Sequence, residues 1–318
     1  KLQKQILMIK YIRVRTLAIL IPLLSFCTSA DSADSLSTRM AFQGKSTFSQ
    51  DVRLPPIPET ASFAGEELPL KYFDVRESLV REITSLSYLH GTMIYIMQLD
   101  NRYGPEIRRI LKEEGIHDDF YYLCIAESML QPLVSPANAA GYWQFLAATA
   151  REYGLFVDNE VDERYNIEKS TRAAAAYFRK AYAEFGSWTM AAASYNTGLS
   201  NVRYRMNIQS KENYYDTQFV EETGRYVFRA VAFKTILNNR ERYGFHLNQA
   251  DLFPPLEYTV VEVKGSVENW SDFAAKHNTN FKLIKMYNQW IRANRLDNKQ
   301  KRTYKVLIPA KGFRERSE

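Results

Sequence analysis

The chain has 318 residues, of which 46% are hydrophobic and 25% are charged, with a formal net charge of +6. This length can hold one large core and one small extra module. Lysines and arginines are spread along the chain without a basic block that interleaves with aromatics, which argues against nucleic acid as a partner. Two cysteines exclude a disulfide framework, and four widely separated histidines fit no metal-ligand spacing. We therefore expect neither a metal nor another cofactor.

Residues 1–30 are typical of an export signal. Basic residues precede the apolar run Leu17–Leu24, which is too short to cross a bilayer. The segment ending at Cys27 resembles a lipoprotein box, in which the cysteine becomes the lipidated first residue, although Phe26 is bulky for that box. Cleavage after Ala30, which would leave a soluble exported protein, is the alternative.

Residues 31–70 are rich in Ser, Asp and Pro and lack a sustained hydrophobic period, which predicts a flexible linker. Helical patterning then begins. Apolar residues recur every three or four positions from Leu79 to Met97 and predict one long amphipathic helix. Pro105 is expected to open a short helix that Gly115 closes.

The segment from Asp118 to Glu127 is predicted to be a capped helix that is apolar all round and therefore buried. Periodicity predicts three further helices, over residues 170–185, 188–194 and 222–238. Strand patterns are almost absent before residue 257. The main domain, residues 71–250, is therefore predicted to be all-α.

The pattern changes after Pro254-Pro255. A strand-like run is followed by two helical stretches and a second strand, over residues 258–263, 268–277, 281–288 and 304–308. This β-α-α-β order predicts a small separate module at residues 256–312. The predicted fold class is thus mainly α, with one helical domain and one small β-α-α-β domain.

Glu127 is the only charged side chain between Phe120 and Ala150, where 25% charged content would average about eight. On a helix it shares a face with Leu123 and Cys124, so its carboxylate should be desolvated. Desolvation raises the pKa of a carboxyl group toward neutrality, which is the tuning that a general acid needs. The alternative is a helix-end glutamate that points to water or pairs with a distant arginine.

Residues 138–145 combine small residues with Tyr142, Trp143 and Gln144, which suits a sugar-binding site. Small residues let a flat ring approach, Tyr142 or Trp143 could stack on it, and Gln144 could hydrogen-bond to it. The alternative is a tight interhelical turn, and a core position is favoured for Trp143. The next charged residues, Asp162 and Glu163, are interpreted as a surface cap.

Taken in order, these motifs resemble the catalytic domain of the soluble lytic transglycosylase family. The resemblance runs from about Leu79 to Gly244 and rests on the following elements: Glu127-Ser128, Ser135, Gly141-Tyr-Trp-Gln-Phe145 with Thr149-Ala150, Val161-Asp-Glu-Arg164, Ser170-Thr171 through Tyr177, Ala193-Ser-Tyr-Asn-Thr-Gly198, and Glu222-Thr-Gly-Arg-Tyr-Val227. Thr197 stands where the family prefers Ala, and Gly224 replaces a common Arg. These departures put substrate detail, rather than reaction type, in doubt.

The resemblance implies a goose-type lysozyme-like fold and peptidoglycan glycan strands as the substrate. It implies that Glu127 is the sole catalytic acid/base, and that the sugar subsites are lined by Ser135, Gln144, Tyr195, Asn196 and Tyr226. The implied reaction cleaves the β-1,4 bond between N-acetylmuramic acid (MurNAc) and N-acetylglucosamine (GlcNAc) and forms a 1,6-anhydro sugar. Most glycosidases need two carboxylates, but one suffices if the substrate supplies the nucleophile. A muramidase-type hydrolase and a catalytically inactive peptidoglycan-binding protein are the alternatives.

The C-terminal module resembles a degenerate LysM domain, a binder of GlcNAc-containing glycans. Asn288 and Ile308-Pro309 match, but Lys264-Gly265-Ser266 stands where a Gly-Asp pair is usual. Glycan binding and a structural or partner-binding role both remain open. We expect a monomeric periplasmic protein, anchored to the outer membrane through a lipid on Cys27 or released in soluble form.

Overall fold

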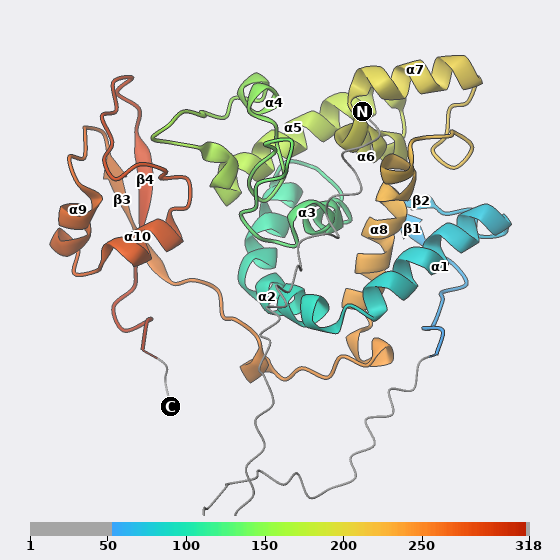
Figure 1. Cartoon of the computed structure of the whole chain (residues 1–318), viewed down its shortest axis with the longest axis horizontal. Helices are drawn as coiled ribbons and strands as arrows, with labels where there is room; N and C mark the ends of the chain where they lie inside the picture. Colours follow the sequence, from blue (N-terminus) through green and yellow to red (C-terminus); the bar gives the residue numbers. More distant parts are fainter. Residues whose placement is uncertain (1–52, 316–318) are drawn as a thin grey trace, which may run out of the picture. The chain divides into compact units, whose positions relative to one another are not determined.

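The computed structural model describes residues 53–315 (Figure 1). The predictions for residues 1–30 and for Cys27 lie outside these described residues. None of the helices in the described part is long and apolar enough to span a membrane. Its α-helices are α1 (Phe73–Ser87), α2 (His90–Glu113), α3 (Phe120–Ser128), α4 (Ala147–Glu152), α5 (Ile167–Phe185), α6 (Trp188–Thr197), α7 (Leu199–Gln209), α8 (Glu221–Leu237), α9 (Trp270–Lys276) and α10 (Phe281–Tyr287). Its strands are β1 (Ser62–Phe63), β2 (Glu66–Glu67), β3 (Tyr258–Val263) and β4 (Tyr304–Pro309). The predicted fold class is confirmed.

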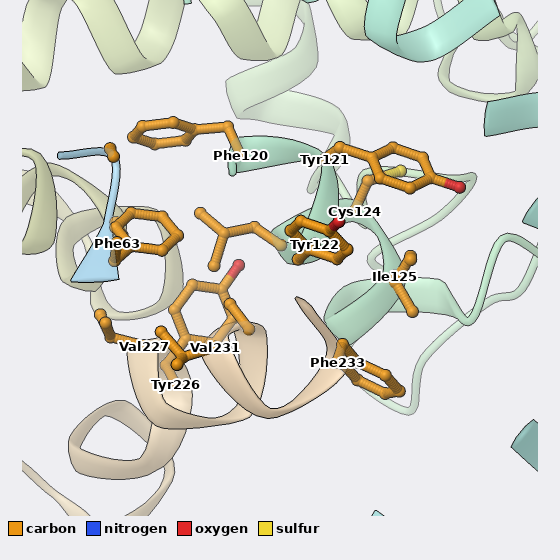
Figure 2. Close-up of a cluster of buried hydrophobic side chains, with 14 of the residues drawn as sticks. Phe63, Phe120, Tyr121, Tyr122, Cys124, Ile125, Tyr226, Val227, Val231 and Phe233 are labelled. Carbon is orange, nitrogen blue, oxygen red and sulfur yellow. The ribbon is translucent and has the colours of Figure 1, made fainter. Parts of the chain in front are cut away.

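Helix α3 lies at the centre of the helical core. Its side chains from Phe120 to Ile125 are all buried, so the prediction of a helix that is apolar all round is confirmed. Figure 2 shows side chains of α8, among them Tyr226 and Val231, pointing toward those of α3, with Phe63 of β1 beside them. Each fully buried apolar side chain of this kind stabilises the fold by roughly 1.5–3 kcal/mol. This packing fixes α3, and with it Glu127, relative to α8.

Asp119 does not cap α3, contrary to the sequence prediction. Its backbone is already helical, and its side chain makes no capping hydrogen bond. The carboxylate instead accepts hydrogen bonds from the Ala64 amide and from the Lys234 ammonium, each at 2.7 Å. A tertiary ion pair has replaced the local cap.

The boundary between the predicted long helix and the predicted short helix lies at a different place in the structure. The chain breaks between α1 and α2 at Tyr88-Leu89, and Pro105 lies inside α2 instead of opening a helix. An internal proline costs a helix one hydrogen bond and about 3 kcal/mol. Ile107, Ile110 and Leu111 follow it on the core side, fully buried. Their burial offsets that cost.

The last part of the predicted linker belongs to the fold. β1 and β2 form a small antiparallel hairpin, and Phe63, Leu68 and Leu70 are buried. The Glu66 carboxylate accepts hydrogen bonds from the Trp188 amide at 2.5 Å and the Thr189 amide at 3.0 Å, at the positive N-terminal end of α6. The prediction of a flexible linker is therefore wrong for residues 61–70.

The C-terminal module (orange to red in Figure 1) has the predicted β-α-α-β order. β3 and β4 pair antiparallel, from Tyr258 opposite Pro309 to Val263 opposite Tyr304. The buried side chains of the module also contact Val161 and Tyr165 of the helical domain. The two parts thus share a hydrophobic cluster, and the predicted domain boundaries remain a prediction.

Candidate active site

Glu127 lies in the last turn of α3, where the helix reaches the surface of the core. Its carboxylate is half-buried, while Cys124, one turn earlier, is fully buried. The Oε1 atom of Glu127 accepts a hydrogen bond of 2.5 Å from the hydroxyl of Tyr226 on α8. Two residues that the sequence proposed for one site are therefore in direct contact.

The pKa of Glu127 is raised to about 7. Burial is the largest cause; the hydrogen bond from Tyr226 lowers the pKa, the charge of Glu222 raises it, and the charge of Arg229 lowers it. A carboxyl group with this pKa exchanges its proton near neutral pH, which suits general acid/base catalysis. Because its folded-state pKa lies above the usual 4.5, its contribution to stability is present below about pH 4.5 and is lost as the pH rises through about 7.

Helix α6 brings Tyr195 and Asn196 to the same region. Burial is the main cause that raises the pKa of Tyr195 well above its usual value, and the charge of Glu127 is the next, so the two groups are neighbours. The Tyr195 hydroxyl donates to the Trp143 carbonyl at 2.7 Å. The Asn196 Oδ1 accepts a 2.7 Å hydrogen bond from the hydroxyl of Thr223. Thr223 lies one turn before Tyr226 on α8 and therefore shares its helix face.

Gln144 and Ser135 hold the loop between α3 and α4 together. Gln144 has a left-handed backbone (φ 48°), and its side-chain amide donates to the carbonyls of Leu133 at 3.0 Å and Gly141 at 2.8 Å. The Ser135 hydroxyl accepts from the Ala139 amide at 3.1 Å. The donor group of Gln144 is thus used inside the loop, and its carbonyl oxygen is the atom left for a ligand.

The two aromatic rings proposed for stacking are buried. Trp143 is 0% exposed and donates its Nε1 hydrogen to the Thr171 hydroxyl at 2.9 Å, which confirms the favoured core position. Tyr142 is 1% exposed, and its hydroxyl donates to Gln289 of the C-terminal module at 2.9 Å. The suggestion that either ring could stack on a sugar is wrong.

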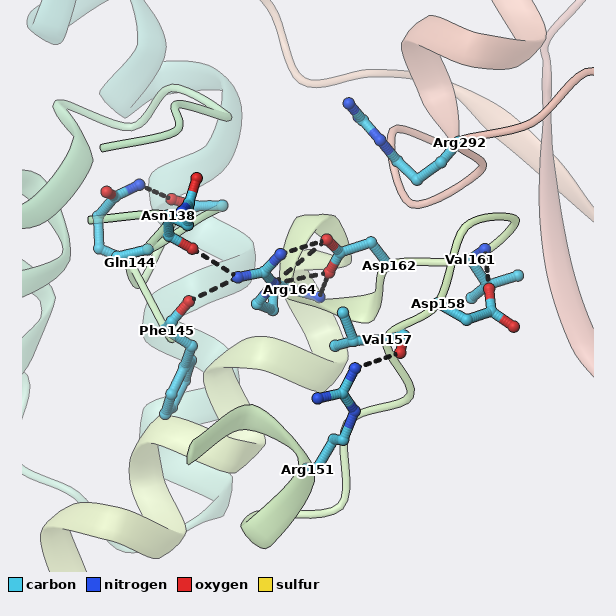
Figure 3. Close-up of polar contacts among 12 residues, drawn as sticks. Asn138, Gln144, Phe145, Arg151, Val157, Asp158, Val161, Asp162, Arg164 and Arg292 are labelled. Atoms are coloured by element: carbon cyan, nitrogen blue, oxygen red, sulfur yellow. Dashed lines mark hydrogen bonds and ion pairs between the residues drawn. The ribbon is translucent and has the colours of Figure 1, made fainter. Parts of the chain in front are cut away.

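A buried ion pair holds this loop in place, as Figure 3 shows. The Arg164 guanidinium pairs with Asp162 at 2.7 Å and donates to the carbonyls of Asn138 and Phe145, both at 3.0 Å. The interpretation of Asp162 and Glu163 as a surface cap is wrong, because they are only 6% and 3% exposed. Consecutive charged residues are usually exposed to solvent. The carbonyls that accept hydrogen bonds from Arg164 are distant in the sequence, so no local pattern predicts that Arg164 is buried.

Two family models match the chain. Residues 107–218 match the transglycosylase SLT domain, and residues 259–312 match the soluble lytic transglycosylase C-terminal LysM-like domain. The chain carries an SLT domain. The family resemblance of the motifs is thereby confirmed, and so is the lysozyme-like helical fold that it implied. Tyr226 lies beyond the matched range of the SLT domain, so its place beside Glu127 comes from the structure alone.

The chain is also similar to two curated relatives. It is 28% identical over 207 residues to the membrane-bound lytic murein transglycosylase D of Escherichia coli strain K12 and to the protein of the same name from E. coli O6:H1 strain CFT073. The matched part covers 62% of this chain and 45% of each relative. The matched part thus spans less than half the length of these relatives.

Proposed function

We propose that this protein is a peptidoglycan lytic transglycosylase that cleaves the β-1,4 bond between MurNAc and GlcNAc. The observation that carries the proposal is the half-buried carboxyl of Glu127, with a pKa of about 7 and a hydrogen bond from Tyr226, within an SLT domain. The names of the two relatives, lytic murein transglycosylases, support the same reaction.

In the proposed mechanism, Glu127 serves as acid and then as base. The protonated carboxyl donates its proton to the glycosidic oxygen as the bond to C1 of MurNAc breaks. The carboxylate then takes the proton of the MurNAc C6 hydroxyl, whose oxygen bonds to C1 and closes a 1,6-anhydro ring. The proton returns to Glu127 and no water is consumed. Between the two steps the Tyr226 hydroxyl stabilises the ionised carboxylate of Glu127, because a hydrogen bond to the charged form favours that form.

A hydrolase that uses water is the second candidate, and the charge of Glu222 favours it. Glycosidases that hydrolyse their substrate pair an acid with a second carboxylate, about 5–9.5 Å away. Glu222 influences the pKa of Glu127, but it is exposed in the first turn of α8, where the helix dipole stabilises a carboxylate without any catalytic role. An intramolecular hydroxyl, by contrast, has a high effective concentration and needs no second carboxylate.

We assign the sugar subsites to Ser135, Gln144, Tyr195 and Asn196, together with Tyr226 beside the Glu127 carboxyl. Asn196 and the carbonyl oxygen of Gln144 are positioned by their own hydrogen bonds and would bind hydroxyl or acetamido groups. Tyr195 and Ser135 would shape the subsites through the backbone that they hold, at Trp143 and Ala139.

We further propose a monomer in the periplasm, held at the outer membrane by a lipid on Cys27. The word "membrane-bound" in the relatives' name supports a cell-envelope location. The LysM-like module would contribute to glycan binding. Fractionation of cells that express the whole chain tests the anchor, and recovery in the soluble fraction would contradict it.

A zymogram tests the enzymatic proposal against an inactive peptidoglycan-binding protein. The full chain, renatured in a gel that contains purified peptidoglycan, is expected to leave a cleared band. A catalytically inactive binder would retain affinity for peptidoglycan and leave the gel opaque. Binding without clearing, in a preparation shown to be refolded, would overturn the proposal.

Replacing Tyr226 with phenylalanine is expected to shift the pH dependence of cleavage. The hydrogen bond from Tyr226 lowers the pKa of Glu127, so its loss raises that pKa further. Cleavage that needs protonated Glu127 is lost as the pH rises through its pKa, so this limb of the profile should move to higher pH, with a lower maximum. Tyr243→Phe, which removes a hydroxyl bonded to the distant Pro56 carbonyl, is the control. A limb that stays in place or moves to lower pH would show that Tyr226 does not tune Glu127.

A further inference from the structure

We infer that the C-terminal module positions the active-site loop of the SLT domain, in addition to any binding of glycan. The bracing segment is Gln289-Trp290-Ile291, which begins two residues after the end of α10, and the braced loop is residues 138–145, which contains Gln144. This inference rests on the proposed function. It assigns Gln289 as a positioning residue for the reaction, although Gln289 does not contact the catalytic carboxyl.

The first contact runs through Tyr142 to the helix that carries Glu127. The Tyr142 hydroxyl donates to the Gln289 Oε1 at 2.9 Å. The Tyr142 carbonyl accepts from the Cys124 thiol at 3.4 Å, and Cys124 lies one turn before Glu127 on α3. The carbonyl of the next residue, Trp143, accepts from Tyr195. The segment Tyr142-Trp143 therefore links the module to α3, which carries Glu127, and to α6, which carries Tyr195.

The second contact runs through the buried ion pair. The Trp290 carbonyl accepts from the Asp162 amide at 2.9 Å. The Asp162 carboxylate binds Arg164, whose guanidinium donates to Asn138 and Phe145, at the two ends of the braced loop. The hydrogen bonds of the Arg164 guanidinium to Asp162 and Phe145 are buried and charge-assisted, so they are stronger than exposed, neutral ones.

Apolar packing also connects the bracing segment to the braced loop. Ala140 of the loop, Val161 and Tyr165 belong to the same buried cluster as Trp290 and Ile291 of the module. Val161 also forms an antiparallel bridge with Ile291. A module attached only by a linker would leave these side chains exposed, whereas here they share one core. The loop and the module are thus held together by apolar packing as well as by hydrogen bonds.

Gln289→Leu tests the inference, because leucine keeps the bulk of the side chain but cannot accept the Tyr142 hydrogen bond. We expect kcat on soluble glycan fragments to fall about fivefold to tenfold, as for loss of one positioning hydrogen bond, with KM nearly unchanged. Gln289→Glu keeps an acceptor oxygen and should restore most of kcat. Tyr142→Phe should lose as much as Gln289→Leu, and the double variant should lose no more than either single variant.

The matched control is Gln249→Leu, the same change at an exposed glutamine in the segment that leads to the module. Amide hydrogen exchange supplies a readout that does not need activity. In Gln289→Leu the amides of residues 138–145 should exchange faster than in the wild type, while those of α8 should not. Unchanged exchange and a kcat within twofold of wild type, or additive losses in the double variant, would overturn the inference. A wild-type chain without activity would contradict the proposed function, and the exchange measurement would then decide the brace by itself.

Discussion

Glu127→Gln is expected to eliminate measurable glycan cleavage while leaving the fold intact. Loss of a general acid typically lowers the rate about 10²–10⁴-fold, and here one carboxyl group would serve both proton transfers. Glutamine retains the shape and can still accept the hydrogen bond from Tyr226, so the geometry of α3 and α8 should persist. The measurement is the rate of muropeptide release from purified peptidoglycan by the full chain.

Stability provides an internal check on this variant. Because burial raises the pKa of Glu127 to about 7, the ionised carboxylate costs stability at pH 8, and a neutral glutamine avoids that cost. The variant should therefore unfold at the same or a higher temperature than the wild type at pH 8. Glu222→Gln is the matched control and should lose far less activity, since Glu222 is exposed at the start of α8. Retention of more than about a tenth of wild-type activity in Glu127→Gln would place the chemistry elsewhere.

Gly141→Ala is expected to disrupt the active-site loop. Gly141 has a left-handed backbone (φ 81°), and an added Cβ would lie 1.9 Å from the Arg164 carbonyl oxygen. The left-handed conformation alone costs a non-glycine residue about 1–2 kcal/mol. The clash adds to that cost, because Arg164 is fixed by its ion pair with Asp162 and cannot retreat. We expect a clear fall in the unfolding temperature, of about 5 °C or more, and more than a tenfold loss of cleavage.

Gly154→Ala separates the two causes. Gly154 has nearly the same backbone angle (φ 83°), but nothing lies within 4 Å of the position of its Cβ. This control variant has only the free-energy cost of the left-handed backbone, without a steric clash, and should keep most of its activity. If both alanine variants lost stability and activity equally, the close approach of Gly141 to Arg164 would have no special role.

The features that sequence could predict are those whose signal is local. The unbroken apolar run around Cys124 predicts a buried helix, and the lone charge of Glu127 within it predicts a desolvated carboxylate. Both the burial of α3 and the raised pKa of Glu127 agree with this. The β-α-α-β order of the module follows in the same way from alternation, helical period and the break at Pro254-Pro255.

The features that sequence missed depend on partners far along the chain. The hydrophobic period continues across Tyr88-Leu89, so the break between α1 and α2 carries no local signal. Arg164 is buried because its guanidinium meets the backbone carbonyls of the preceding loop. Tyr142 is buried, and its hydroxyl donates to Gln289, 147 residues later. For Arg164 and Tyr142 the observed contact is tertiary, and side-chain type alone indicated a more exposed environment.

Mass spectrometry of the released muropeptides tests most directly whether the substrate supplies its own nucleophile. If Glu127 directs the C6 hydroxyl of MurNAc to C1, the products of the full chain end in 1,6-anhydroMurNAc and carry no new reducing end. They are then lighter by one water, about 18 Da, than the same fragments produced by hydrolysis. Digestion with a muramidase that is known to hydrolyse supplies the reference masses. Dominant products with a reducing MurNAc end would contradict the transglycosylase mechanism and favour a hydrolase on the same fold.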